Sequence, residues 1–215
     1  MRWSGVILAG LAGFVLAGAA TADEAKVKSA DRASAYMRVY GPALPPFGFV
    51  QFCETWPTEC LSGTSSMETE QRFLASPERL SELDEVNRFV NKTIQPATDL
   101  EIYGTSEFWA IPRDRGDCED YALLKRRMLM QRGWPSSSVL MTVVRDEQGE
   151  GHAVLTARTA QGDFILDNKV DVVKLWYLTP YDYVMRQSYL NPKVWMSLDP
   201  QANSPASIAG VRARR

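Results

Sequence analysis

Three β-rich runs separated by two short turns occupy residues 137–168, and they constrain the fold more than any other feature of the chain. The runs are SSVLMTVVRD, HAVLTAR and FILDN, and the turns between them are EQGEG and TAQGD. Consecutive strands joined by short turns that contain glycine pair as an antiparallel meander. Because helix-like segments precede these runs, the sequence predicts an α+β fold in a single domain over residues 23–198.

Composition fits such a domain and excludes several function classes. The 215 residues are 45% hydrophobic and 23% charged, with a formal net charge of -2. These values are ordinary for one globular domain with a substantial core. A net charge so near zero provides no basic field for nucleic acid or for an anionic membrane surface, so neither is an expected partner.

Two helices are predicted ahead of the strands. The first covers residues 77–95, where apolar side chains recur at intervals of three and four, and Ser76 precedes it as an N-cap. The second covers about 118–131, with Asp117 as its cap and a glycine at its end. The basic residues 125–127 of the second helix are predicted to lie on its solvent-exposed face.

The remaining segments of the domain allow coarser predictions. Residues 41–60, GPALPPFGFVQFCETWPTEC, are rich in proline and aromatic residues and are predicted to form an irregular arm. Residues 99–116 are predicted to be a loop, in which Trp109 is a candidate core residue. Residues 176–198 are rich in Tyr and Val and are predicted to add strands.

The two ends of the chain have the composition of processed or unfolded segments. Residues 1–22 carry one basic residue, an apolar stretch rich in Gly and Ala, and a final Ala-Thr-Ala, which is the layout of a secretory signal peptide. Cleavage after Ala22 predicts a periplasmic protein with no membrane span, and an uncleaved anchor is the alternative. Residues 199–215 are polar and basic, and they are predicted to form a disordered tail.

The three cysteines divide into a pair and a single thiol. Cys53 and Cys60 lie seven positions apart across a Trp-Pro turn, a spacing that a disulfide can close, and disulfides persist in exported proteins. A metal site at this pair is less favoured, because the chain has only one further cysteine and one histidine. The pairing would leave Cys118 as an odd thiol in an exported protein.

Cys118, His152 and Asp167 each stand at the end of a predicted element. Cys118 lies in the first turn of a helix, where free backbone N–H groups and the helix dipole favour a thiolate. His152 opens the second strand, and Asp167 ends the adjacent third strand, from which a carboxylate can orient an imidazole. The three residues fit the roles of nucleophile, base and orienting group. Taken singly, such residues are more often a core cysteine, a surface histidine and a turn aspartate.

The segments GDCEDYALLKRRMLMQRGWP, DEQGEGHAVLTA and FILDN resemble the bacterial transglutaminase-like cysteine peptidases, over about residues 36–198. The resemblance implies a papain- and transglutaminase-like core, in which the helix that bears the catalytic cysteine packs on an antiparallel sheet that bears the histidine and the aspartate. It also implies that Cys118, His152 and Asp167 form the catalytic triad.

The same resemblance implies a calcium ion beside the nucleophile. Acidic residues that flank the cysteine bind this ion in the family, and Asp117 and Glu119 match those positions. Carboxylate oxygens are hard ligands that suit Ca²⁺, whereas a thiolate does not, so the ion would lie beside the sulfur. Asp120 is a further candidate ligand. The alternative is that these acids only complement the helix N-terminus.

The resemblance therefore predicts an exported cysteine peptidase that hydrolyses an amide bond in a protein substrate, such as a surface or periplasmic protein. Acyl transfer to a lysine amine, as in a transglutaminase or an amidase, would use the same three residues. A calcium-binding adaptor without turnover would need only the fold. The 53–60 loop and the short 109–116 stretch depart from the family pattern, so the family's substrate is not carried over.

Overall fold

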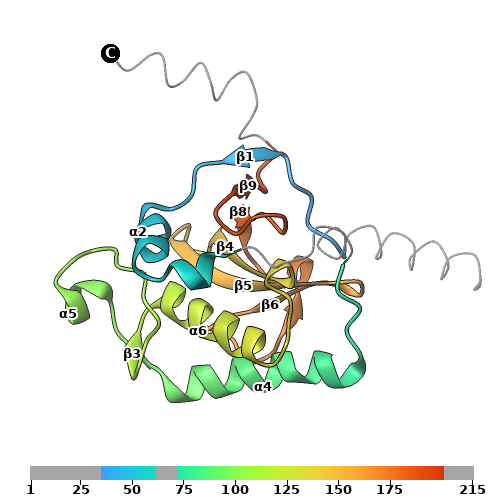
Figure 1. Ribbon diagram of the computed structural model, residues 1–215, viewed down its shortest axis with the longest axis horizontal. Coiled ribbons are helices and arrows are strands. Elements are labelled where there is room, and N and C mark those ends of the chain that lie inside the picture. The colour runs from blue at the N-terminus through green and yellow to red at the C-terminus, as the bar shows by residue number, and fades with distance from the viewer. Residues whose placement is uncertain (1–34, 62–71, 201–215) are drawn as a thin grey trace, which may run out of the picture. The chain divides into compact units, whose positions relative to one another are not determined.

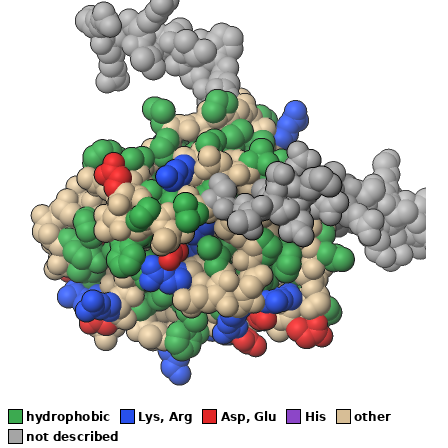
Figure 2. All heavy atoms as spheres, viewed as in Figure 1, with side chains coloured by type: hydrophobic (Ala, Val, Ile, Leu, Met, Phe, Trp, Pro, Cys, Tyr) green, Lys and Arg blue, Asp and Glu red, His purple; other side chains and the backbone are tan. Residues whose placement is uncertain are grey.

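The computed structural model describes residues 35–61 and 72–200 (Figure 1). The predicted signal peptide and the part of the predicted tail from residue 201 onward lie outside these ranges. Within them, no helix is both long enough and apolar enough to cross a membrane. On the face seen in Figure 2, basic and acidic side chains are interspersed, as expected for a net charge of -2.

A seven-stranded antiparallel sheet with the order β1-β9-β8-β4-β5-β6-β7 forms the centre of the fold. Its strands are β1 (Gly41–Ala43), β4 (Val139–Arg145), β5 (Gly151–Thr159), β6 (Gly162–Leu166), β7 (Lys174–Leu175), β8 (Asp182–Gln187) and β9 (Trp195–Ser197). Strands β4, β5 and β6 are the predicted meander. Strands β8 and β9 confirm the strands predicted within residues 176–198.

The two predicted helices are present and lie side by side (Figure 1). Helix α4 (Pro77–Thr93) begins at Ser76, whose side chain accepts a hydrogen bond from the backbone of Arg79. Helix α6 (Cys118–Gln131) packs on β4 and β5, while α4 packs against α6 and reaches β6. The predicted α+β class is therefore confirmed, with the cysteine-bearing helix on an antiparallel sheet.

Burial of apolar side chains fixes the helices on the sheet. Val86 and Val90 of α4, Leu129 of α6 and Leu155 of β5 are all 0% exposed and belong to one core. A smaller core, which includes Val154, lies on the other face of the sheet, since successive strand residues point to opposite faces. The position of α6 relative to β5 is thus set by a dry, close-packed contact.

The irregular arm predicted for residues 41–60 is wrong. After β1, this segment forms helix α2 (Phe47–Thr55) and a 3₁₀ turn, η1 (Pro57–Cys60). Phe49 and Phe52 of α2 are each 2% exposed, and the ring of Phe49 lies 5.3 Å from that of Trp195. Tertiary burial of one helix face outweighs the proline and glycine content of the segment, which argued against a helix.

The loop predicted for residues 99–116 contains two short elements. Helix α5 (Asp99–Tyr103) begins at Thr98, which forms a capping box with Glu101. Strand β3 (Arg115–Gly116) pairs in parallel with β2 (Gln95–Pro96). The rest of the segment is irregular, and the remaining 3₁₀ turns of the described chain are η2 (Ser136–Ser138) and η3 (Trp176–Leu178).

Two of the three basic residues predicted to be solvent-exposed on α6 are buried. Lys125 is 1% exposed and Arg126 is 2% exposed. The Arg126 guanidinium donates hydrogen bonds to the backbone oxygens of Val139, at 3.1 Å, and Glu59, at 2.9 Å. Burial lowers the pKa of Lys125 to about 7. Helix α6 is covered by the sheet, by α4 and by the turn after α2, so only a narrow strip remains for solvated side chains.

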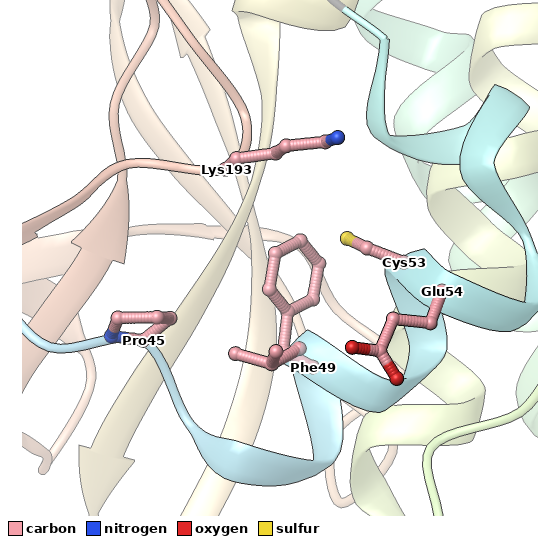
Figure 3. Close-up of a pocket in the computed structure, with 6 residues that line it drawn as sticks. Pro45, Phe49, Cys53, Glu54 and Lys193 are labelled. Carbon is pink, nitrogen blue, oxygen red and sulfur yellow. The ribbon is translucent and has the colours of Figure 1, made fainter.

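The predicted disulfide between Cys53 and Cys60 is present and joins α2 to η1. The residue before Cys60 ties this loop to α6, since the Glu59 carboxylate accepts a hydrogen bond of 2.9 Å from Arg127. Cys53 also lines a cavity of about 240 Å³ between α2 and the chain before β9 (Figure 3). The lining residues are Pro45, Phe49, Val50, Cys53, Glu54 and Lys193.

Removing the disulfide is expected to destabilise the protein by about 2–3 kcal/mol, since a short cross-link removes loop entropy from the unfolded chain. Urea unfolding of the Cys53→Ser/Cys60→Ser variant and of oxidised wild type measures the difference. A reducing agent should lower the unfolding midpoint of the wild type and leave that of the double variant unchanged. Equal midpoints for oxidised and reduced wild type would contradict this account of the loop.

Candidate active site

Cys118 is the first residue of α6, and the chain that enters the helix is held by backbone pairing. The β2–β3 pair fixes Gly116 next to Pro96, immediately before Asp117. Asp117 occupies the predicted N-cap position, but its side chain makes no capping hydrogen bond. A Cβ atom at Gly116 would lie 2.7 Å from the side chain of Asp120, so the close approach of backbone and carboxylate requires glycine. The Gly-Asp-Cys sequence therefore forms the closely packed turn that leads into α6.

The thiol of Cys118 lies between β5 and the side chain of Glu119. It donates a hydrogen bond to Glu119 Oε2 at 3.1 Å, and the backbone N–H of Ala153 donates to Sγ at 3.4 Å. Burial raises the pKa of Cys118 well above its usual value, and the charge and hydrogen bond of Glu119 raise it further; the Ala153 N–H opposes them. With the acids unneutralised, the sulfur is held as a thiol.

His152 and Asp167 form a buried pair at the ends of neighbouring strands. His152 Nε2 lies 2.9 Å from Asp167 Oδ1, and the two residues are 4% and 5% exposed. Since Nε2 faces the carboxylate, Nδ1 is the ring nitrogen left for the thiol. Ala153, which follows His152 in the chain, contacts Sγ of Cys118. The structure thus gathers the three predicted catalytic residues at one place, and their roles stay a prediction.

The Asp167 carboxylate accepts hydrogen bonds on both oxygens. Oδ1 also accepts from the backbone N–H of Lys169 at 3.0 Å, and Oδ2 accepts from the hydroxyl of Tyr181. Burial alone would raise the pKa of Asp167, but the hydrogen bonds from His152, Tyr181 and Lys169 outweigh burial and lower it. Asp167 is therefore a stable anion beside the imidazole.

Three carboxylates converge beside the thiol. One oxygen from each of Asp99, Asp117 and Glu119 lies within 4.8 Å of the other two. Oδ1 of Asp99 and Oδ1 of Asp117 are buried and have no hydrogen-bond partner. Buried carboxylate oxygens without a partner are costly, and a hard divalent cation is the kind of group that such oxygens bind. The donor set therefore fits Ca²⁺ chemically, with backbone oxygens or water needed to complete the coordination.

The acidic cluster agrees only in part with the predicted ligands. Asp117 and Glu119 belong to it, whereas Asp120 is not one of the three converging acids. Asp120 Oδ1 accepts a hydrogen bond of 2.8 Å from the backbone N–H of Ala110, and its Oδ2 is buried without a partner. Asp99 was missed, because its distance from Asp117 depends on how α5 packs. The one sequence signal for α5 was the Thr-x-x-Glu capping box at its start.

Burial holds protons on several of these acids. The pKa of Asp99 is raised to about 6, chiefly by burial and then by the charges of Asp117 and Glu107, against the hydrogen bond from Phe108. The pKa of Asp120 is raised to about 8 by burial, with smaller effects of neighbouring carboxylates. Burial and the Asp117 charge also raise the pKa of Glu119. Without a cation, the cluster is therefore partly protonated near neutral pH.

The cavity beside α2 is a different place. None of Cys118, His152 and Asp167 lines it, although it is a well-formed apolar pocket with one acid and one lysine at its rim (Figure 3). The free thiol, the histidine–aspartate pair and the acidic cluster all lie near the start of α6, so the candidate active site is assigned there.

One protein family and several solved structures are similar to this chain. The family model for bacterial transglutaminase-like cysteine proteinases (BTLCP) matches residues 39–203. Among solved structures, calcium-bound Legionella pneumophila LapG is 22% identical, with a TM-score of 0.47 over 66% of this chain and 83% of that chain. A second structure of Legionella pneumophila LapG is 24% identical, with a TM-score of 0.47 over 66% and 81% of the two chains. No curated protein matches the sequence significantly.

The acidic cluster predicts a specific pH dependence of stability when a chelator is present. Asp120 has a higher pKa in the folded than in the unfolded protein, so the folded state binds more protons between about pH 4 and 8, and the free energy of unfolding falls as pH rises. Asp120→Asn removes this titration. The variant should therefore gain stability over wild type as pH rises from 5 to 8, by at most about 1.4 kcal/mol per pH unit.

Urea unfolding in EGTA at several pH values measures this gain. The matched control is Asp114→Asn, since Asp114 is exposed and lies outside the cluster. A stability difference between Asp120→Asn and wild type that is constant with pH would refute the protonated-cluster interpretation.

Proposed function

The chain belongs to the bacterial transglutaminase-like cysteine proteinases, and we propose that it is an exported peptidase that hydrolyses an amide bond in a protein substrate through Cys118, His152 and Asp167. One observation supports this proposal above all. The chain's one free cysteine begins a helix, and its sulfur contacts the residue next to a buried histidine–aspartate pair. This is the spatial order of nucleophile, base and orienting group.

In the proposed reaction, His152 Nδ1 takes the proton of the Cys118 thiol while the sulfur attacks the amide carbonyl carbon. The tetrahedral intermediate collapses as the C–N bond breaks, and His152 gives the proton to the leaving amine. His152 then takes a proton from water, whose oxygen attacks the thioester carbon, and the proton returns to the departing sulfur. Asp167 keeps its charge and holds Nε2–H throughout.

The oxyanion that forms in both steps needs hydrogen-bond donors. The first backbone N–H groups of a helix have no partner within the helix, and that of Cys118 is the first of α6. We assign it as a donor to the oxyanion, since a fixed N–H aimed at developing charge stabilises the transition state.

Calcium is assigned to Asp99, Asp117 and Glu119. The convergence of these side chains and the two buried oxygens without partners support this assignment. A bound cation would supply positive charge that lowers the pKa of the neighbouring thiol. Glu119 connects the proposed cation site with the proposed nucleophile. Its carboxylate belongs to the acidic cluster and also accepts the hydrogen bond of the Cys118 thiol.

The proposed setting is the periplasm. The signal-peptide pattern of residues 1–22 supports export, and the Cys53–Cys60 disulfide supports a compartment that is oxidising. The protein substrate is then expected in the same compartment or at the cell surface.

Replacement of the nucleophile tests the reaction. Wild type, incubated with envelope proteins of the source organism, should generate new protein N-termini detectable by mass spectrometry, and Cys118→Ala should generate none while it keeps the wild-type unfolding midpoint. His152→Ala should lower the cleavage rate by about 10²–10⁴-fold. Cleavage by Cys118→Ala would refute the mechanism. New isopeptide bonds in place of new termini would identify acyl transfer, and neither product would favour the adaptor.

Replacement of Asp99 tests the cation site. Asp99→Asn should weaken calcium binding at least about tenfold in isothermal titration calorimetry, because one of three charged ligands is lost. Asp114→Asn, an exposed acid outside the cluster, should bind calcium like wild type. Calcium should also accelerate alkylation of Cys118 by iodoacetamide in wild type, and less so in Asp99→Asn. Equal calcium affinity in both variants would exclude Asp99 as a ligand.

A further inference from the structure

Tyr181 contacts both members of the buried histidine–aspartate pair. Its hydroxyl donates a hydrogen bond to Asp167 Oδ2, and its ring meets the imidazole of His152 edge to face, with ring centroids 5.6 Å apart and an angle of 69° between the planes. It belongs to the segment that leads into β8, whereas the pair lies on β5 and just after β6. A side chain from a third segment thus packs against the histidine–aspartate pair.

The Asp167 carboxylate needs such a contact. His152 and the backbone of Lys169 both bond to Oδ1, so they leave Oδ2 free. The last torsion of an aspartate side chain has a broad energy well, and bonds to one oxygen alone do not fix the plane of the carboxylate. The hydroxyl of Tyr181 fixes that plane from the other side, and the direction of the bond to Nε2 follows from it.

Simple burial does not explain this hydrogen bond. Tyr181 is only half-buried, and together with Trp176 and Tyr183 it lines an open cavity of about 740 Å³. Water in such a cavity can satisfy a phenol hydroxyl at little cost. The hydroxyl nevertheless lies against a carboxylate whose negative charge makes the hydrogen bond stronger than one to a neutral group.

We propose that Tyr181 is a positioning residue that fixes the Asp167 carboxylate and, through it, the tautomer and orientation of the His152 imidazole. The inference rests on the proposed peptidase function, in which His152 must present Nδ1 to the thiol. Tyr181 itself touches neither the nucleophile nor, in this proposal, the substrate. Its effect is expected on turnover and not on substrate binding.

Tyr183 provides a matched control. It lies two residues further along, and its hydroxyl contacts Thr179 Oγ1 at 2.8 Å and Trp176 O at 3.3 Å, both in its own segment. Tyr181→Phe and Tyr183→Phe each remove one hydroxyl and keep the ring. Only the first change removes a hydrogen bond to Asp167.

NMR of the untagged full chain reads the predicted effect directly, because His152 is the only histidine. The Nε2–H proton of His152 should move in chemical shift and exchange with water at least about tenfold faster in Tyr181→Phe, since the carboxylate that holds it is less ordered. Tyr183→Phe should give the wild-type spectrum. An unchanged His152 signal in Tyr181→Phe would overturn the inference, whether or not the protein proves to be a peptidase.

Kinetics supply the second readout. With a substrate identified from the new N-termini, Tyr181→Phe should lower kcat by roughly tenfold and leave KM within about twofold, because one hydrogen bond to a charged group is lost. The loss should vanish when Tyr181→Phe is made in an Asp167→Ala background, since the residue acts through Asp167. Independent effects of the two changes would overturn the inference. A further outcome separates the two proposals. If neither wild type nor any variant cleaves a protein, but the His152 signal changes in Tyr181→Phe as predicted, the peptidase proposal fails and the positioning role of Tyr181 is retained.

Discussion

Burial of several carboxylates at the start of α6 is the constraint on which the rest of the candidate site depends. Charge repulsion is a second cost: oxygens of three carboxylates lie within 4.8 Å of one another, and two unit charges at that limit repel by about 3.5 kcal/mol at an effective dielectric constant near 20. Burial first and repulsion second raise the pKa of Glu119, whose carboxyl group also accepts the hydrogen bond of the Cys118 thiol. The β2–β3 pair, the glycine at position 116 and the packing of α6 on β5 force the acids together despite the repulsion.

The candidate active site consists of two parts with opposite electrostatic requirements: the sheet part, with His152 and Asp167, and the helix part, with Cys118 and the acidic cluster. In the sheet part, an anion is required at Asp167, and three hydrogen bonds supply it whether or not a cation is present. In the helix part, negative charge is in excess, and it opposes formation of the Cys118 thiolate. The two parts meet where the backbone N–H of Ala153 donates a hydrogen bond to the sulfur of Cys118. Packing of α6 on β5 therefore brings the candidate site together.

What the sequence could predict was local. Periodicity and caps located α4 and α6, turn spacing located the meander of β4 to β6, and the loop spacing located the disulfide; each involves residues that are near in the chain. The failures were contacts between distant segments. Helix α2 depends on burial of Phe49 and Phe52 in the main core, where Phe49 meets Trp195 of β9. Lys125 is buried because α4 and the sheet cover α6. Asp99 and Tyr181 join the site from segments whose direction no local pattern specifies.

The acidic cluster at the start of α6 bears on how the proposed nucleophile Cys118 could work among so many acids. A helix N-terminus favours a thiolate by a partial positive charge of about half a unit, which cannot outweigh several nearby carboxylates. Acids that only complemented the helix would therefore work against the thiol that they flank. They become compatible with nucleophilic chemistry when their charge is neutralised, and two buried oxygens without partners, on Asp99 and Asp117, are available for a cation. In the proposed peptidase, reactivity of Cys118 thus depends on occupation of the cluster, while His152 and Asp167 stay preorganised in either state.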